Sequence, residues 1–347
     1  MVLVLGKVVQ KVIPPQNQQV VALVARLFPE PLAVRRLWMG LKKVRIGTRG
    51  SGLALKQTQE IINQLKVFYP EIEFEVKIIK TKGDKILDAP LAKIGGKGLF
   101  VKEIEEALQK GEIDLAIHSL KDMPTFLPEG LCLGAIPQRE DPRDAVITQD
   151  NTSFSQLPSN ALIGTSSLRR QAQLLHLNPD FKIVPLRGNV DTRVRKLRQQ
   201  GLDAIILASA GLKRMGMIEQ ITEYLSPEVM LPAIGQGALG VEIRKERIWQ
   251  DFVVPLNHLP TAIATQAERA FLARLEGGCQ VPIAAHAVVN GGEIEIKGLV
   301  ADTTGKRFFK HALRGSKELA AQLGKQLAEI LLSQGAKEVL DQIYAKS

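Results

Sequence analysis

From residue 44 onward, short apolar runs alternate with longer stretches in which apolar side chains recur every three or four positions. The short runs predict strands at residues 44–47, 74–81 and 114–118. The longer stretches predict amphipathic helices at residues 52–68 and 99–110. Strands that alternate with helices in this way favour an α/β fold built on a parallel sheet.

The same alternation resumes after residue 144 and predicts a second α/β unit. Its expected strands lie near residues 145–148, 162–164, 182–185 and 204–207, with helices near 167–177 and 190–200. A third unit is expected to contain a helix at 261–276, strands at 283–289, 293–300 and 307–313, and a helix at 317–331. Two proline-containing breaks, at residues 137–144 and 231–235, predict hinge-like crossings between the first two units.

Composition narrows the partners of such a chain. Its 347 residues suffice for two or three domains, and its formal net charge of +10 favours a nucleic acid, a membrane surface or an acidic small molecule. Aromatic residues make up only 5% and are almost missing from the basic segments, which weakens the case for a nucleic-acid binder. Two cysteines cannot form a disulfide framework, so we expect a reducing compartment. No apolar run is long enough to span a bilayer, and the five histidines are too scattered to predict a metal site.

The first forty residues differ from the rest of the chain. They carry five basic residues against the single acidic residue Glu30, contain no serine or threonine, and are interrupted by four prolines. Three interpretations stay open: an upstream start codon with the natural start at Met39, an organelle-targeting peptide, and an ordered arm. We expect the first, which makes residues 1–40 an extension that is disordered or the product of a mis-assigned start.

Arginine and hydroxyl side chains follow three of the expected strands, at the points where helices begin. The three segments are residues 48–51, 164–170 and 186–193. Backbone amides at a helix start, hydroxyl donors and guanidinium groups together favour an anion, and the planar fork of arginine suits a carboxylate. A solvated charged face is the alternative, and it suits Arg195, Lys196 and Arg198 better than the arginines at strand ends.

Lys121 and Asp122 come directly after the expected strand at 114–118. Ligands of open α/β sheets bind beyond the carboxyl ends of strands, where a partly desolvated carboxylate can stabilise a cation or handle a proton. A solvated turn is the alternative.

Residues 91–100 are rich in glycine and lysine but lack the ending of a P-loop, so we interpret them as a mobile loop over a cleft. Residues 235–240 match G-x-G-x-x-G, but we reject a dinucleotide site because no clear strand precedes them.

Cys279 lies in a bend with the sequence Leu-Glu-Gly-Gly-Cys-Gln-Val-Pro, at residues 275–282. Two glycines before the cysteine and a proline after it take the backbone out of regular structure. An exposed thiol there can reach a cleft and bond to a ligand, whereas a buried cysteine that fills a tight corner is the alternative. A covalent anchor together with an arginine-lined cleft predicts a tethered acidic molecule that grows.

These segments, in this order, resemble those of the hydroxymethylbilane synthase (porphobilinogen deaminase) family from about residue 44 to the C-terminus. The stretch at 275–282 is similar to the family's cofactor-attachment motif. The resemblance implies a transferase of tetrapyrrole biosynthesis that joins four porphobilinogen molecules head to tail, loses ammonia at each step and releases linear hydroxymethylbilane. It also implies one covalent dipyrromethane cofactor per chain, held by a thioether to Cys279.

Residue by residue, the resemblance assigns Asp122 as the catalytic carboxylate, which holds pyrrole N–H groups and stabilises the positive charge formed when ammonia leaves. Other matched positions bind carboxylates, assist turnover or line the cleft: Arg49, Ser51, Lys93, Lys97, Lys121, Thr165, Ser167, Arg169, Arg170, Arg187, Arg193 and Gln236. Each pyrrole ring carries an acetate and a propionate, which explains why such a cleft needs many cations. No metal is implied.

The fold that the resemblance implies is α/β, with two lobes like those of periplasmic binding proteins, a hinge, and a smaller C-terminal domain. The first lobe would be residues 41–138 plus 236–257, the second 142–232, and the third domain 260–347, which carries Cys279. The expected protein is a cytoplasmic monomer, or an organellar one if residues 1–38 are a targeting peptide. Its partners would be porphobilinogen and the growing polypyrrole, with no nucleic acid and no membrane. The alternative is a non-enzymatic two-lobed anion-binding protein, which would carry no covalent pyrrole adduct.

Overall fold

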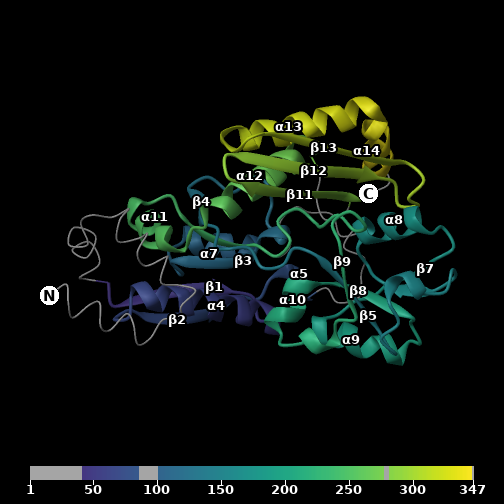
Figure 1. Cartoon of the computed structure of the whole chain (residues 1–347). Coiled ribbons are helices and arrows are strands. Elements are labelled where there is room, and N and C mark those ends of the chain that lie inside the picture. Colours follow the sequence, from purple (N-terminus) through teal and green to yellow (C-terminus); the bar gives the residue numbers. More distant parts are fainter. Residues whose placement is uncertain (1–40, 86–100, 277–280, 346–347) are drawn as a thin grey trace.

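The computed structural model describes residues 41–85, 101–276 and 281–345, which contain three sheets (Figure 1). Two five-stranded sheets form two lobes, and a three-stranded sheet with its helices forms a smaller third part. The third part contacts both lobes. Arg269 Nη2 donates to the Pro124 carbonyl at 2.7 Å in the first lobe, and Gln171 Nε2 in the second lobe donates to the Thr303 carbonyl at 3.0 Å.

The sheet of the first lobe has the strand order β2-β1-β3-β10-β4. Its strands are β1 (Lys43–Thr48), β2 (Glu73–Ile78), β3 (Leu115–Ser119), β4 (Leu131–Ala135) and β10 (Leu239–Arg244), and its helices are α4 (Gly52–Phe68), α5 (Lys82–Lys85), α7 (Lys102–Gln109) and α11 (Arg247–Val253). Helices α4 and α11 bury apolar side chains such as Leu65 and Phe252 on one face of the sheet. Helix α7 buries Ile104 and Leu108 against the other face.

The sheet of the second lobe has the corresponding order β7-β6-β8-β5-β9. Its strands are β5 (Asp144–Thr148), β6 (Leu162–Gly164), β7 (Lys182–Val184), β8 (Ala204–Ala208) and β9 (Glu223–Leu225), and its helices are α8 (Leu168–Leu177), α9 (Val190–Gln199) and α10 (Ser209–Arg214). Helix α8 buries Leu174 on one face of this sheet, and α9 and α10 bury Leu197 and Leu212 on the other.

The third sheet consists of β11 (Ile283–Asn290), β12 (Glu293–Ala301) and β13 (Phe308–Ser316), which pair antiparallel in chain order. Helices α12 (Leu259–Arg274) and α13 (Ala320–Leu331) bury Phe271 and Leu327 against it, and α14 (Lys337–Tyr344) follows. A side chain at Gly324 would collide with the backbone of Ala267, so this glycine allows α13 to pack closely on α12.

The sequence predicts parallel sheets, and this prediction is wrong for one strand of each lobe. β10 runs antiparallel to β3 and β4, and β5 runs antiparallel to β8 and β9. Both strands enter their lobe directly from a crossing, without the helix that would return the chain to the same edge of the sheet. The expected fold class is confirmed: two α/β lobes joined by two crossings, with a smaller C-terminal α/β domain.

The two crossings lie against each other. The Glu140 N–H donates to the Gly237 carbonyl at 3.2 Å. Gly237 has a φ of +88°, and a side chain there would collide with the Glu140 carbonyl, so the close approach requires glycine. The G-x-G-x-x-G motif at residues 235–240 therefore serves this approach, and the element that follows it is a strand rather than the helix of a dinucleotide site.

Arg214, the last residue of α10, links the lobes beside the crossings. Its Nε donates to Glu60 Oε2 of α4 at 2.8 Å, and its Nη2 donates to the Gly237 carbonyl at 3.3 Å. The second lobe is therefore tied both to a helix of the first lobe and to the chain that returns to it.

Glu268 of α12 ties the third domain to both crossings. Its carboxylate is fully buried and accepts from Arg139 Nη1 at 2.6 Å, from the Gly235 N–H at 2.7 Å and from the Ala287 N–H at 2.9 Å. Burial alone would raise the pKa of Glu268, but Arg139 and then His286 outweigh it and hold the pKa at about 2. A charged carboxylate thus fixes the third domain to the chain between the lobes.

We expect Glu268→Gln to lower the free energy of unfolding by about 3 kcal/mol at pH 7, because it leaves the Arg139 guanidinium without its counter-charge. Folding lowers the pKa of Glu268 from about 4.3 to about 2, so its stabilisation is present above about pH 4.3 and is lost as the pH falls toward 2. Urea unfolding at pH 7 and at about pH 3 measures both effects. The difference in the free energy of unfolding between the wild type and Glu268→Gln should be smaller at the lower pH.

Glu329→Gln is the matched control, since Glu329 forms an exposed ion pair with Arg274. It should change the free energy of unfolding by less than about 1 kcal/mol. Equal free energies of unfolding for Glu268→Gln and the wild type at pH 7 would contradict the role given to Glu268.

Candidate active site

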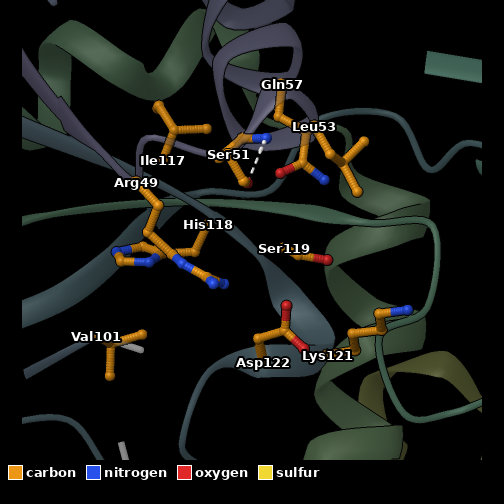
Figure 2. Close-up of a pocket in the computed structure, with 11 residues that line it drawn as sticks. Arg49, Ser51, Leu53, Gln57, Val101, Ile117, His118, Ser119, Lys121 and Asp122 are labelled. Atoms are coloured by element: carbon orange, nitrogen blue, oxygen red, sulfur yellow. Dashed lines mark hydrogen bonds between the residues drawn. The ribbon is translucent and has the colours of Figure 1, made fainter. Parts of the chain in front are cut away.

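The carboxyl ends of β1 and β3, which are neighbours in the first sheet, open onto a recess (Figure 2). It contains about 490 Å³ of empty space, its open mouth included. Its lining comes from the end of β3, from the segments after β1 and β3, from α4 and from the start of α7: Arg49, Ser51, Leu53, Ala54, Gln57, Val101, Ile117, His118, Ser119, Lys121 and Asp122. Four of the predicted site residues therefore share one recess: Arg49, Ser51, Lys121 and Asp122.

Asp122 ends a short 3-10 turn, η2 (Leu120–Asp122), that directly follows β3. Leu120 is buried beneath the turn, and its N–H donates to the Ala238 carbonyl at 3.0 Å, which fixes the turn against the second crossing. The Asp122 side chain is half-buried, and Figure 2 shows its carboxylate on the same recess as the Arg49 guanidinium. The turn thus holds a carboxylate at the mouth of the sheet, where the sequence predicts it.

Lys121 lies between Asp122 and the second lobe. Burial lowers the pKa of the Lys121 ammonium, Asp122 opposes that shift, and the positive charge of Arg170 adds to it. The influence of Arg170 shows that the cations of the second lobe are close enough to act on the turn that carries Asp122.

In the second lobe, Arg169 and Arg170 of α8 converge on Asp144, the first residue of β5. Arg169 Nη1 donates to Asp144 Oδ2 at 2.7 Å, and Arg170 Nη2 donates to Asp144 Oδ1 at 2.7 Å. Gln236 Nε2, from the second crossing, donates to the same Oδ1 at 3.0 Å. The structure therefore brings three predicted site residues together around a carboxylate that the sequence analysis does not single out.

The Asp144 carboxylate is fully buried, and each arginine is only 5% exposed. Burial would raise the pKa of Asp144, but Arg169 and Arg170 outweigh it and hold this pKa well below its usual range. Two guanidinium charges meet one carboxylate charge, so the group retains one positive charge.

Arg187 and Arg193 extend this positive region. Arg193 Nε donates to the Gly188 carbonyl at 2.7 Å, which draws the side chain back toward the loop between β7 and α9. Burial and then the charges of Arg170 and Arg187 lower the pKa of Arg193 to about 10, while Asp122 acts in the opposite direction. We call Arg169, Arg170, Arg187 and Arg193 the arginine cluster; Asp122 lies within its electrostatic reach.

The predicted hydroxyl ligands have structural partners. Ser51 Oγ accepts from the Ala54 N–H at 3.3 Å (dashed in Figure 2) and begins α4, and Ser167 Oγ accepts from the Arg170 N–H at 3.4 Å and begins α8. Thr165 is buried, and its Oγ1 accepts from the Ser167 N–H at 3.2 Å. These bonds fix the two strand-to-helix turns; a role of the hydroxyls toward a ligand stays a prediction.

Three predicted site residues, Lys93, Lys97 and Cys279, lie outside the described residues, so their roles also stay predictions. The residues that flank the bend at Cys279 are placed: Leu275 and Val281 are both buried in the core of the third domain.

The structure adds three residues that the sequence analysis does not select, namely Asp144, Gln57 and His118. Asp144 lies in the segment interpreted only as a hinge. The many charged residues of that segment, Arg-Glu-Asp-Pro-Arg-Asp, are the signal that could have drawn attention to it. Gln57 and His118 line the recess from α4 and β3.

Within the described ranges, no group of three His, Cys, Asp or Glu side chains is arranged to hold a metal ion. Of the helices that the structure describes, none combines the length and the apolar character needed to cross a membrane.

Two family models match the chain. The model described as "Porphobilinogen deaminase, dipyromethane cofactor binding domain" covers residues 44–249, and "Porphobilinogen deaminase, C-terminal domain" covers residues 262–333. Among solved structures, the methionine-binding protein MetQ overlaps 62% of this chain and 89% of its own, with a TM-score of 0.38 and 14% identity, a level from which we draw no argument.

Three bacterial relatives, each named porphobilinogen deaminase, are similar over most of their length. The protein of Syntrophotalea carbinolica is 56% identical over 303 residues, which are 87% of this chain and 96% of the relative. That of Pelobacter propionicus is 52% identical over 306 residues (88% and 98%), and that of Geobacter metallireducens is 54% identical over 309 residues (89% and 97%). Since the two models cover most of the chain and these relatives share more than half of their residues with it, the chain belongs to the porphobilinogen deaminase family.

Proposed function

We propose that this chain is a transferase that joins four porphobilinogen molecules head to tail with loss of ammonia and then releases linear hydroxymethylbilane by hydrolysis. The observation that carries the proposal is the position of Asp122. Its carboxylate lies at the end of β3, in the recess of the first lobe and within reach of the arginine cluster of the second. A reaction that develops positive charge on its substrate and lengthens a polyanion needs both features.

The dipyrromethane cofactor of the family suits the residues of this cleft. Its two pyrrole rings bring carboxylates, and the site residues offer six cations, Arg49, Lys121 and the arginine cluster, against the carboxylates of Asp122 and Asp144. Among the residues that the structure describes, none donates a hydrogen bond to the buried Oε1 of Gln236, beside Asp144. When bound, this cofactor supplies the primer on which the chain of rings grows, and we assign Cys279 as its anchor.

Asp122 is the catalytic residue in this proposal. Its carboxylate accepts hydrogen bonds from pyrrole N–H groups and stabilises the positive charge that develops on porphobilinogen as ammonia leaves. A fixed carboxylate in a half-buried recess contributes about 3 to 4 kcal/mol to such a step, because it need not reorient when the charge appears.

The cations divide into two groups by burial. Arg49, Lys121, Arg187 and Arg193 are half-buried, and we assign them to the carboxylates of the substrate and of the growing chain. Arg169 and Arg170 are nearly fully buried around Asp144, and we assign their remaining positive charge to a carboxylate of the cofactor. Ser51, Thr165, Ser167 and Gln236 position these groups, and we assign Lys93 and Lys97, which lie outside the described residues, to the same carboxylates.

We assign domain boundaries that follow the three sheets: residues 41–138 plus 236–257, residues 142–232, and residues 260–347. We also propose that the chain acts as a cytoplasmic monomer without nucleic acid or membrane. The low aromatic content supports the absence of nucleic acid, and the presence of only two cysteines supports a reducing compartment.

Intact-protein mass spectrometry with peptide mapping tests the proposal directly. We expect an excess mass of two linked pyrrole units on the peptide that contains Cys279. Cys279→Ser should lose the adduct, while Cys132→Ser, which changes the half-buried free thiol of β4, should keep it. A wild-type protein that stays at its polypeptide mass after incubation with porphobilinogen would favour the non-enzymatic anion-binding protein.

Asp122→Asn should lower the rate of ammonia release by about 10³-fold, because an amide cannot stabilise the developing positive charge. The fraction of protein that carries the adduct, measured in the same sample, separates catalysis from cofactor loading. Asp191→Asn, which changes an exposed aspartate on α9, is the control and should leave the rate unchanged. A rate for Asp122→Asn equal to that of the control would remove Asp122 from the catalytic role.

Arg170→Gln should lower the free energy of unfolding by about 3 kcal/mol, because it removes the buried hydrogen bonds from Arg170 to Asp144 Oδ1 and to the Ile206 carbonyl. It should also reduce the fraction of protein that carries the adduct, because the group around Asp144 loses its excess positive charge. Thermal unfolding and intact mass measure the two effects. Arg195→Gln, on the exposed face of α9, should change neither. Normal stability together with full loading of Arg170→Gln would show that Arg169 alone suffices.

A further inference from the structure

A buried polar group lies behind the recess, between the first sheet and α7. It consists of His118 on β3, Glu242 on β10 and Glu105 on α7, which are 5%, 0% and 7% exposed. His118 Nε2 lies 3.0 Å from Glu242 Oε2. The proposed function uses none of these side chains, and charged groups are rarely buried in a core without a purpose.

The sheet register explains why His118 and Glu242 meet. His118 pairs with Gly240, and Glu242 pairs with Ala116, so His118 and Glu242 are diagonal neighbours on one face of the antiparallel pair. Helix α7 packs on that face and buries Glu105 there.

Both carboxylates have an oxygen that makes no hydrogen bond. Glu105 Oε1 and Glu242 Oε1 are buried and lack partners within the described residues. Burial and then the negative charge of Glu242 raise the pKa of Glu105 to about 7, while His118 acts in the opposite direction. Glu105 therefore gains and loses a proton near neutral pH, next to a carboxylate that is bonded to an imidazole.

His118 also lines the recess to which we assign the substrate. It lines the recess together with Asp122 and Arg49 (Figure 2), and its Nε2 is turned to Glu242. An imidazole with a carboxylate behind one ring nitrogen and a reaction cleft on its other side is an arrangement that moves protons.

The reaction produces a proton that needs an acceptor. At each condensation a carbon–nitrogen bond of porphobilinogen breaks, a carbon–carbon bond forms, and the attacked pyrrole carbon loses its hydrogen as a proton. The amine enters as an ammonium group and leaves as neutral ammonia, so each step releases one ammonia and one proton.

We propose that His118, Glu242 and Glu105 form a proton relay that opens into the Asp122 recess through the imidazole and takes up the proton released at each condensation. This inference rests on the proposed function. His118 is the residue that faces the reaction, and Glu242 and Glu105 are positioning residues behind it. Other titratable or charged groups that face the relay are Arg269 of α12, Cys132 of β4, and Arg49 and Asp122 in the recess.

The first test is a titration of His118 by nuclear magnetic resonance in the full-length, cofactor-loaded protein, which needs no turnover. The ring resonances of wild-type His118 should show an inflection near pH 7, where Glu105 loses its proton. In Glu105→Gln this inflection should disappear, because the neighbouring carboxyl group that titrates there is gone. Glu106→Gln, at an exposed position of the same helix, is the control and should match the wild type. Identical titrations of Glu105→Gln and the wild type would overturn the proposal.

The second test follows turnover as ammonia release. His118→Asn should lower kcat by about 10²-fold with a smaller change in KM, and added imidazole should restore part of the rate of His118→Gly. Glu105→Gln should shift the pH profile of kcat near pH 7, which a merely structural role would not do. His311→Asn, on β13, is the control for loss of a histidine.

Two outcomes overturn the relay: a kcat of His118→Asn within about twofold of the wild type, or no effect of imidazole together with an unshifted profile of Glu105→Gln. Either outcome leaves ammonia release by the wild-type protein intact. Failure of the proposed function itself would instead appear as a wild-type protein that releases no ammonia from porphobilinogen.

Discussion

The Asp144 carboxylate holds together the segments from which the cleft is built. It begins β5 directly after the first crossing, it pairs with both arginines at the start of α8, and it accepts from Gln236 of the second crossing. Two adjacent guanidiniums that are nearly excluded from solvent would repel each other and lose their hydration. Because Asp144 neutralises one of the two charges, the pair can stay buried and still present positive charge to the opposite lobe.

The two lobes and the third domain are joined by the same physical device, a buried carboxylate that binds arginine and backbone N–H or amide donors. Asp144 connects both crossings with α8, and Glu268 connects both crossings with α12 and β11. Such pairs contribute less net stability than their short distances suggest, because both ions lose water. Their geometric demands are strict, however, so they fix how the two crossings lie against α8, α12 and β11.

Much of the fold follows from local sequence, and the missed parts have physical reasons. Helix α4 has the predicted bounds because an apolar periodicity begins just after Ser51, a residue that caps it. Strand β10 was not predicted, because its sequence is partly hidden in the glycine motif and contains the buried Glu242. Strand β9 has only three residues and carries little pattern. The antiparallel pairing of β5 depends on the direction from which the chain enters the second sheet, and a short stretch of sequence does not contain that information.

The site residues likewise divide into those that the sequence predicts and those that only the folded chain brings together. Arg49 and Asp122 meet because both follow neighbouring strands, a consequence of sheet topology that sequence motifs can anticipate. The sequence predicts Ser51 and Ser167 as ligands, and in the structure each accepts a hydrogen bond from a backbone N–H at a helix start. The same side chains suit both tasks, so residue type cannot separate them. The pairing of Asp144 with Arg170 spans 26 positions and joins a hinge to a helix, which only the folded chain reveals.

The contact between the crossings at Glu140 and Gly237 has a mechanical consequence. Two tethers pressed together behave like a flat strap, which bends across its thin direction and resists torsion. Lobes joined in this way swing about one axis rather than rotate freely. Motion about such an axis changes the distance between Asp122 and the arginine cluster more than it changes their alignment along the strap.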